Sequence, residues 1–139
     1  MSLSHTGPFR TLLFAPGNHS RRVEKALCLK ADVVILDLED AVAVAEKVTT
    51  RAIVVDALQN ERSGLGYVRV NAYETDFCFG DLLVVVAEGV DGIVLPKVET
   101  SAQLQSVDWL VSQLEREKGL SPGGIDIIPI IETGKGVAN

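Results

Sequence analysis

Three carboxylates follow an apolar run in the segment ADVVILDLEDAV, residues 31–42. The run itself has the length and composition of a buried strand. Asp37, Glu39 and Asp40 would lose favourable hydration if they were buried without partners. We therefore expect these acids to leave the apolar core and to meet cationic side chains in a polar pocket.

Two bases and a further acid stand at similar places in later apolar runs. Glu132 ends IDIIPIIE, and with a second carboxylate it would suit a hard cation, Mg²⁺ or Mn²⁺. Arg69, in YVRVNA, carries a planar fork that fits a substrate carboxylate or a developing enolate oxygen. Lys97, in GIVLPK, has the amine for a Schiff base, but we favour an ion pair with Asp37 or Glu39. Structural ion pairs at strand ends remain the alternative for each of these charges.

Other catalytic chemistries find little support. The two histidines are His5, in the first ten residues, and His19, in a loop, so a histidine-rich zinc site is disfavoured. No Ser–His–Asp or Cys–His arrangement is legible. Cys28 and Cys78 show no metal-ligand spacing, and we expect both to be buried free thiols in a reducing cytoplasm.

Strand-like and helix-like segments alternate along the chain. The expected strands are residues 11–15, 32–38, 67–72, 92–97 and 125–132. The expected helices are residues 20–30, 45–59, 80–88 and 100–119. The last is the clearest, because Leu104, Val107, Leu110, Val111 and Leu114 form one apolar stripe, with Thr100 or Ser101 as N-cap and Gly119 at the end.

This alternation predicts an α/β fold with a parallel sheet. An open doubly wound sheet and a (βα)₈ barrel compete, but the turn APGNHSR lacks the glycine fingerprint of dinucleotide-binding sheets. Alternation along each strand predicts these shared faces: Val33, Ile35, Asp37 and Glu39; Tyr67, Arg69 and Asn71; Ile93, Leu95 and Lys97; Ile128, Ile130 and Glu132. One face of each strand is thus apolar, and the other turns polar at its C-terminal end, as a barrel active site requires.

The composition excludes several classes of partner. The chain has 139 residues and a formal net charge of −6, so nucleic acid or an anionic membrane is disfavoured as a ligand. No apolar run is long enough to span a membrane. Residues 1–9 read as a flexible arm or tag remnant, and residues 10–139 as one domain.

Taken together, the motifs RTLLFAPGN, ADVVILDLEDAV, VRVNA, GIVLPKVE and IPIIETGKGV resemble the HpcH/HpaI aldolase and citrate lyase β-subunit family. The likeness is nearest to its citrate lyase β-like and malyl-CoA lyase branch and runs over about residues 10–139. It implies a (βα)₈ TIM-barrel enzyme that uses Mg²⁺, of which this chain holds only the first five strands and four helices. The implied reaction makes or breaks a carbon–carbon bond beside an acyl-CoA thioester or a keto acid.

The resemblance assigns roles residue by residue. Glu132 matches a metal-ligating carboxylate, and Arg69 matches the arginine that contacts substrate and the forming enolate. Phe14 and Lys25 match positions around the CoA groove of malyl-CoA lyase-like members. His19 stands where some members carry arginine, so a CoA contact there is in doubt.

The acids of the second strand, Asp37, Glu39 and Asp40, match an acidic strand end that we expect to position metal-bound water and Arg69.

The family's second metal ligand and its general acid are expected beyond residue 139. Five strands would leave two open sheet edges. We favour a portion of a longer enzyme over completion by another copy or a truncated gene product. By resemblance we expect a homo-oligomer, a trimer or hexamer.

Three functions follow. The leading one is a Mg²⁺-dependent lyase acting on citryl-, malyl- or citramalyl-CoA. The second is a class II aldolase acting on hydroxy-keto acids without CoA. The third is a non-catalytic half-barrel that serves as an assembly partner.

Overall fold

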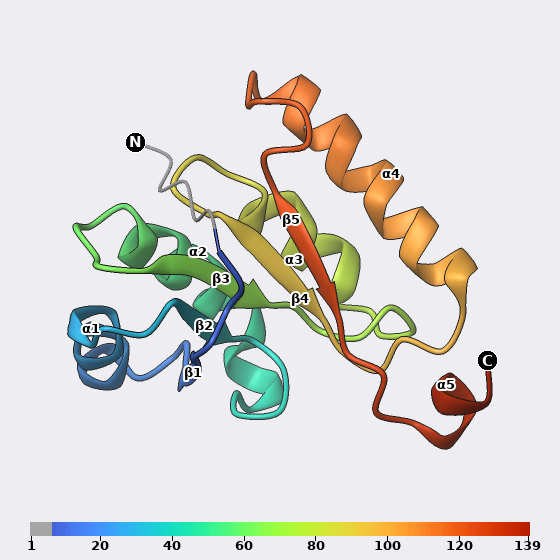
Figure 1. Ribbon diagram of the computed structural model, residues 1–139, viewed down its shortest axis with the longest axis horizontal. Helices are drawn as coiled ribbons and strands as arrows, with labels where there is room; N and C mark the ends of the chain where they lie inside the picture. Colours follow the sequence, from blue (N-terminus) through green and yellow to red (C-terminus); the bar gives the residue numbers. More distant parts are fainter. Residues whose placement is uncertain (1–6) are drawn as a thin grey trace.

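Five parallel strands form one sheet in the computed structural model, which describes residues 7–139 (Figure 1). They are β1 (Leu12–Pro16), β2 (Val33–Asp37), β3 (Leu65–Arg69), β4 (Gly92–Leu95) and β5 (Asp126–Pro129). The strands lie side by side in the order of the chain. A doubly wound sheet instead reverses its order at a switch point. The sequential order is that of a (βα)₈ barrel, and the fold is a part of one, as the sequence predicted.

Four main helices connect the strands at nearly the expected places. They are α1 (Ser20–Cys28), α2 (Lys47–Leu58), α3 (Cys78–Val85) and α4 (Ser101–Glu117). Thr100 caps α4 by accepting a bond from the amide of Gln103 in a complete capping box, and Gly119 takes a φ of +68° after its last turn. A short 3₁₀ turn η1 (Val44–Glu46) and a final helix α5 (Gly134–Ala138) were not predicted.

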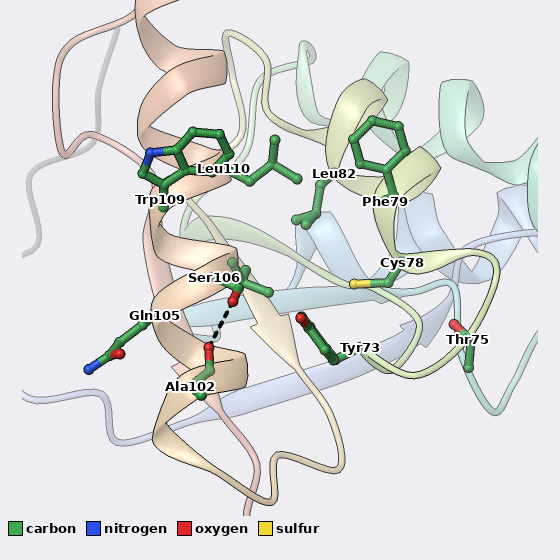
Figure 2. A pocket seen from close by; sticks show the side chains of 11 residues that line it. Tyr73, Thr75, Cys78, Phe79, Leu82, Ala102, Gln105, Ser106, Trp109 and Leu110 are labelled. Atoms are coloured by element: carbon green, nitrogen blue, oxygen red, sulfur yellow. Dashed lines mark hydrogen bonds between the residues drawn. The ribbon is translucent and has the colours of Figure 1, made fainter.

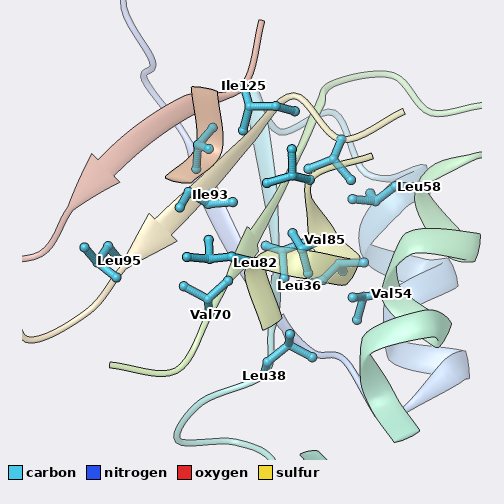
Figure 3. Packing of buried hydrophobic residues seen from close by; sticks show 14 of the residues in the cluster. Leu36, Leu38, Val54, Leu58, Val70, Leu82, Val85, Ile93, Leu95 and Ile125 are labelled. Carbon is cyan, nitrogen blue, oxygen red and sulfur yellow. The ribbon is translucent and has the colours of Figure 1, made fainter. Parts of the chain in front are cut away.

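The main core lies between the sheet and the four helices. Leu36, Leu38, Val68 and Val70 project from the strands toward the helices, where they meet buried side chains such as Leu82. Figure 3 shows Leu36, Leu38 and Val70 packed with side chains of α2 and α3. The stripe predicted on α4 joins this core through Val107, Val111 and Leu114, while Leu104 and Leu110 pack at its margin. Burial of this face fixes which strand residues point the other way.

The opposite face of the sheet carries a smaller apolar cluster. Val33, Ile35, Leu65, Tyr67 and Val94 are buried there, and Ile128 and Ile130 pack against them. Phe9, which we placed in the arm, packs its ring edge-on to Tyr67 with centroids 6.0 Å apart. Residues 1–6 of the predicted arm lie outside the described part of the chain. This inner face is the one that ends in the charged residues.

The predicted alternation is wrong for two strand ends. Ile93 and Leu95 face the helices and not the inner side, so Val94 is the inward residue of β4. Lys97 nevertheless meets Glu39 at the inner side, and its positive φ of +52° breaks the regular alternation of the strand. Asn71 does not share the face of Arg69. Its side-chain amide instead donates a hydrogen bond to Asp81 of α3, at 2.7 Å.

The two cysteines differ in burial. Cys78 is buried, as expected, but Cys28 is exposed, so the prediction of two buried thiols is wrong for that residue. Val23, Ala26 and Leu27 form the buried face of α1, and Cys28 lies outside that face. Within residues 7–139 no helix is both long and apolar enough to cross a membrane.

Candidate functional site

Arg69 and Asp37 form the centre of the polar strand ends. The two residues are direct partners in the register of β2 and β3. Arg69 donates from Nε and Nη2 to the two carboxylate oxygens of Asp37, at 2.7 Å each. Burial alone would raise the pKa of Asp37, but the bonds from Arg69 and from the amides of Glu39 and Ala41 outweigh it and lower that pKa. Asp37 is therefore a fixed anion that sets the orientation of the guanidinium.

The surroundings of Arg69 leave one nitrogen for a ligand. The ring of Phe14 stacks on the guanidinium, with 5.0 Å between Cζ and the ring centroid. Glu39 Oε2 lies 3.9 Å from Nη2, within ion-pair range but beyond hydrogen-bond range. Within residues 7–139, Nη1 makes no hydrogen bond that competes with a ligand. An arginine held on one edge and one face in this way presents its remaining edge for anion binding.

The loop after β2 presents Glu39. The carboxylate of Asp37 accepts bonds from the amides of Glu39 and Ala41, at 2.9 and 3.0 Å. From α2, the buried Lys47 donates to the carbonyls of Leu38 and Glu39 at 2.9 and 2.6 Å. Lys47 was missed by the sequence analysis, because a lysine inside a helical segment looks like any solvated lysine. Here it serves as the support of the acidic loop.

Lys97 closes the other side of this loop, and the predicted ion pair with Glu39 is confirmed. Its Nζ lies 2.5 Å from Glu39 Oε1 and 3.4 Å from Asp40 Oδ1. Burial, followed by the neighbouring carboxyl of Asp40, raises the pKa of Glu39 in spite of Lys97 and Arg69. Glu39 Oε2 is buried without a hydrogen-bond partner in the described chain. That oxygen, beside the arginine, is a buried acceptor whose bond would have to come from a water or a substrate hydroxyl.

Glu132 arrives at the same edge from the end of β5. Its Oε1 accepts the backbone N–H of Lys97 at 3.1 Å, and its side chain is exposed. The carboxylate therefore keeps its second oxygen for a ligand. Residues 7–139 hold no group of three or more His, Cys, Asp or Glu side chains placed to bind a metal. Mg²⁺ usually takes one or two carboxylates and completes its shell with water and substrate oxygens. One exposed carboxylate fits that mode of binding and does not fit a closed protein cage.

The remaining predicted residues lie apart from this cluster. Lys25 is exposed on α1 and makes no hydrogen bond or ion pair with the strand-end residues among those described. His19 is the N-cap residue of α1 and is exposed, with no side-chain capping bond. Of the predicted site residues, the structure brings together Arg69, Glu132, Phe14, Asp37, Glu39 and Asp40.

A buried polar network joins α2 and α3 to the ends of β2 and β3. Asp81 of α3 is fully buried and accepts a bond from Arg51 Nε at 2.8 Å. The other oxygen of Asp81 accepts both the backbone and side-chain N–H groups of Asn71, whose amide also donates to the carbonyl of Leu38. No local pattern in the sequence identifies this network, because its members come from four separate segments of the chain.

An apolar groove lies apart from these strand ends. A groove of about 700 Å³ lies between α3 and α4, lined by Tyr73, Cys78, Phe79, Trp109 and Leu110 among others (Figure 2). None of its lining residues belongs to the charged strand ends. The polar cluster, and not this groove, therefore has the side chains for catalysis.

Known proteins resemble the chain over almost its whole length. The model of the HpcH/HpaI aldolase/citrate lyase family matches residues 10–139. The citrate lyase subunit beta of Leuconostoc mesenteroides subsp. cremoris is 39% identical over 132 residues, which are 94% of this chain and 44% of that protein. The L-malyl-CoA/beta-methylmalyl-CoA lyase of Cereibacter sphaeroides is 38% identical over 138 residues, 95% of this chain and 43% of that protein.

A solved structure agrees with these matches. The citrate lyase beta subunit from M. tuberculosis, complexed with oxaloacetate and magnesium, superposes with a TM-score of 0.69 at 34% identity. The alignment covers 91% of this chain and 49% of that one. The chain thus spans less than half the length of each of these proteins.

Proposed function

Because this chain belongs to the HpcH/HpaI aldolase/citrate lyase family, we propose that it forms the N-terminal part of a Mg²⁺-dependent carbon–carbon lyase. Its substrate is a short 3-hydroxyacyl-CoA of the citryl-, malyl- or citramalyl-CoA type. The bond between the α-carbon and the hydroxyl-bearing carbon breaks, the hydroxyl loses its proton and becomes the keto group, and the electron pair stays with the acyl-CoA as an enolate. Protonation of that enolate gives the acyl-CoA product.

The geometry of Arg69 is the observation that carries this proposal. Asp37 holds two of its nitrogens, Phe14 covers one face of the guanidinium, and Nη1 makes no hydrogen bond within residues 7–139. A preorganised donor of fixed charge stabilises negative charge that develops during a reaction. A substrate carboxylate or the enolate oxygen, each an anion, is the ligand that this edge suits best.

Glu132 is the residue of this chain that would hold the metal. Mg²⁺, when bound, supplies a Lewis acid that orients the keto acid and stabilises negative charge. Lys97 fixes one oxygen of the Glu132 carboxylate and leaves the other available. Glu39 and Asp40 lie on the other side of Lys97, where they hold water or the substrate hydroxyl in place.

Binding of the CoA part is assigned to Phe14 and Lys25 by family resemblance. Phe14 is about half exposed, at 47%, and adjoins Arg69. Lys25 is exposed on α1, where an ammonium is accessible to phosphate groups.

The same proposal includes three further parts: self-association as a trimer or hexamer, a cytoplasmic location, and the use of Mn²⁺ in place of Mg²⁺.

The decisive experiment uses the full-length protein. We expect Mg²⁺-dependent release of an acyl-CoA from at least one of citryl-, malyl- and citramalyl-CoA, and a loss of about 100-fold or more in Glu132→Gln. Glu117→Gln, an exposed glutamate at the end of α4, is the matched control and should keep full activity. Absence of turnover with all three thioesters, or full turnover in Glu132→Gln, contradicts the proposal. Turnover only of CoA-free hydroxy-keto acids supports a class II aldolase instead.

A further inference from the structure

Lys97 has a backbone conformation that no other side-chain-bearing residue in the described chain adopts. It is the only non-glycine residue between 7 and 139 with a positive φ, at +52°. A lysine gains nothing locally from this left-handed region, which is disfavoured for residues with a Cβ atom. Such conformations persist where surrounding contacts impose them, and they concentrate at functional sites. The contacts of Lys97 therefore explain why the conformation is kept.

Lys97 binds two glutamates that follow different strands, Glu132 after β5 and Glu39 after β2. The main-chain N–H of Lys97 donates to Glu132 Oε1 at 3.1 Å. Its side-chain Nζ donates to Glu39 Oε1 at 2.5 Å and lies 3.4 Å from Asp40. Regular alternation would have turned the side chain toward the helices, on the side of Leu95. The left-handed turn is thus what makes both bonds available at once.

From this geometry we infer that Lys97 is a positioning residue that presents the Glu132 carboxylate to a divalent cation through its left-handed main-chain amide. The inference rests on the proposed function, in which Glu132 ligates Mg²⁺. The amide holds one oxygen of Glu132 and the second oxygen is directed to the cation. The ammonium has the separate task of pairing with Glu39 and Asp40, so that these acids do not draw the cation away from Glu132.

Substitutions at position 97 separate the amide from the ammonium. Lys97→Gly and Lys97→Val both remove the ammonium. Glycine accepts a φ of +52° without strain, whereas valine, being β-branched, is strongly disfavoured there. Only the valine variant is thus expected to lose the bond between the main-chain amide and Glu132. The ratio of their Mg²⁺ affinities isolates the contribution of the backbone conformation.

The measurement is the Kd for Mg²⁺ by isothermal titration calorimetry on the full-length protein and its variants. We expect Lys97→Gly to bind Mg²⁺ at least as tightly as the parent, because a cation that repels Mg²⁺ has been removed. Lys97→Val should bind about tenfold or more weakly than Lys97→Gly, the usual effect of losing a hydrogen bond to a charged group. The Mg²⁺ concentration for half-maximal turnover should be higher in Lys97→Val than in Lys97→Gly by the same factor. Asparagine tolerates the left-handed region, so the Kd of Lys97→Asn for Mg²⁺ should equal that of Lys97→Gly.

Gly119 supplies a matched control. It has a φ of +68° at the end of α4, with open space where a Cβ would lie. Gly119→Val introduces the same backbone mismatch away from the strand ends, and should lower the melting temperature without changing the Kd for Mg²⁺. If Lys97→Val does not fold, Lys97→Ala gives a smaller loss in the same direction relative to Lys97→Gly.

The outcomes distinguish this inference from the proposed function. Equal Mg²⁺ affinities for Lys97→Gly and Lys97→Val, in a parent with Mg²⁺-dependent turnover, overturn the role of Lys97 and leave the function standing. If Lys97→Val has a lower melting temperature than Lys97→Gly but the same Kd for Mg²⁺, the role of Lys97 is purely structural. That result also overturns the inference and leaves the function standing. A parent that binds no Mg²⁺ overturns both.

Discussion

Arg69 and Asp37 face each other across neighbouring parallel strands and share two hydrogen bonds of 2.7 Å each. The pair is almost withdrawn from water, with side-chain exposures of 14% and 2%. Burying such a pair costs solvation, and the cost is tolerable only when the geometry is good and the other lone pairs are satisfied. Asp37 meets this condition because the amides of Glu39 and Ala41 occupy its carboxylate as well.

Replacing Arg69 by lysine keeps the charge and removes the planar fork. Lysine cannot bond both oxygens of Asp37 and still direct a third N–H group to substrate. We expect kcat of the full-length enzyme to fall by about 10² to 10³ in Arg69→Lys. Arg10→Lys is the control, because Arg10 bonds Asp32 in a similar two-nitrogen mode at an exposed site and should show unchanged turnover. A kcat within tenfold of the parent would show that the fork is dispensable.

Asp37→Asn tests the pair through stability. The substitution leaves the Arg69 cation buried without its counter-charge, so the free energy of unfolding at pH 7 should fall by about 3 kcal/mol. Urea denaturation of the full-length protein gives this value. Asp56→Asn, on the exposed side of α2, should change it by less than about 0.5 kcal/mol.

The same comparison has a defined pH dependence. The pKa of Asp37 is lowered below its ordinary value of 3.8 in the folded protein. Its stabilising contribution is therefore complete above that value and is lost as the pH falls through the folded pKa. The stability difference between the parent and Asp37→Asn should be constant from about pH 5 to 7 and should shrink below about pH 3.8. A difference that grows on acidification would refute the assignment.

Lys47→Met tests the support of the acidic loop. Methionine fills similar space but leaves the carbonyls of Leu38 and Glu39 without the donor that reaches them now. The expected loss is about 1 to 3 kcal/mol in the free energy of unfolding, together with reduced turnover as Glu39 loosens. Lys30→Met, at an exposed position, is the control. An unchanged unfolding midpoint in Lys47→Met would mean that water replaces the lysine.

The two thiols should react at very different rates. Burial, with a smaller contribution from Asp81, raises the pKa of Cys78 to about 11, while Cys28 is exposed. Because the thiolate is the reactive form, iodoacetamide at pH 8 should label Cys28 within minutes and Cys78 only after unfolding. Peptide mapping by mass spectrometry reports the two sites separately, and Cys28→Ser removes the early product. Early labelling of Cys78 would contradict its burial at the start of α3.

Much of this architecture was predictable because each strand buries one face against helices. That requirement puts apolar residues at alternate positions on the helix side of β2 and β3 and leaves an apolar stripe on α4. Strand alternation then placed Asp37 and Arg69 on one side correctly. The end of β4 could not be predicted in this way, since the left-handed residue Lys97 breaks the period. The partners of Asn71 were equally inaccessible, because Asp81 reaches it from a helix and not from the sheet.

The residues of the site also fall into those that the sequence predicted and those that it did not. Acids and bases that end apolar runs were found, because charge at such a place has to be explained by a partner. Lys47 was not found, since its role depends on two main-chain carbonyls that carry no signature of their own in the sequence. Cys28 was misjudged because an apolar neighbourhood in sequence does not tell which side of a helix a residue occupies.

The sequential strand order also has a consequence for biosynthesis. Each strand pairs with the one made just before it, so every pairing partner is already outside the ribosome when a new strand emerges. Chain elongation proceeds at roughly 5 to 20 residues per second, which gives each strand–helix unit a second or more to dock before the next appears. The growing sheet can therefore be extended one unit at a time during translation, always at its newest edge.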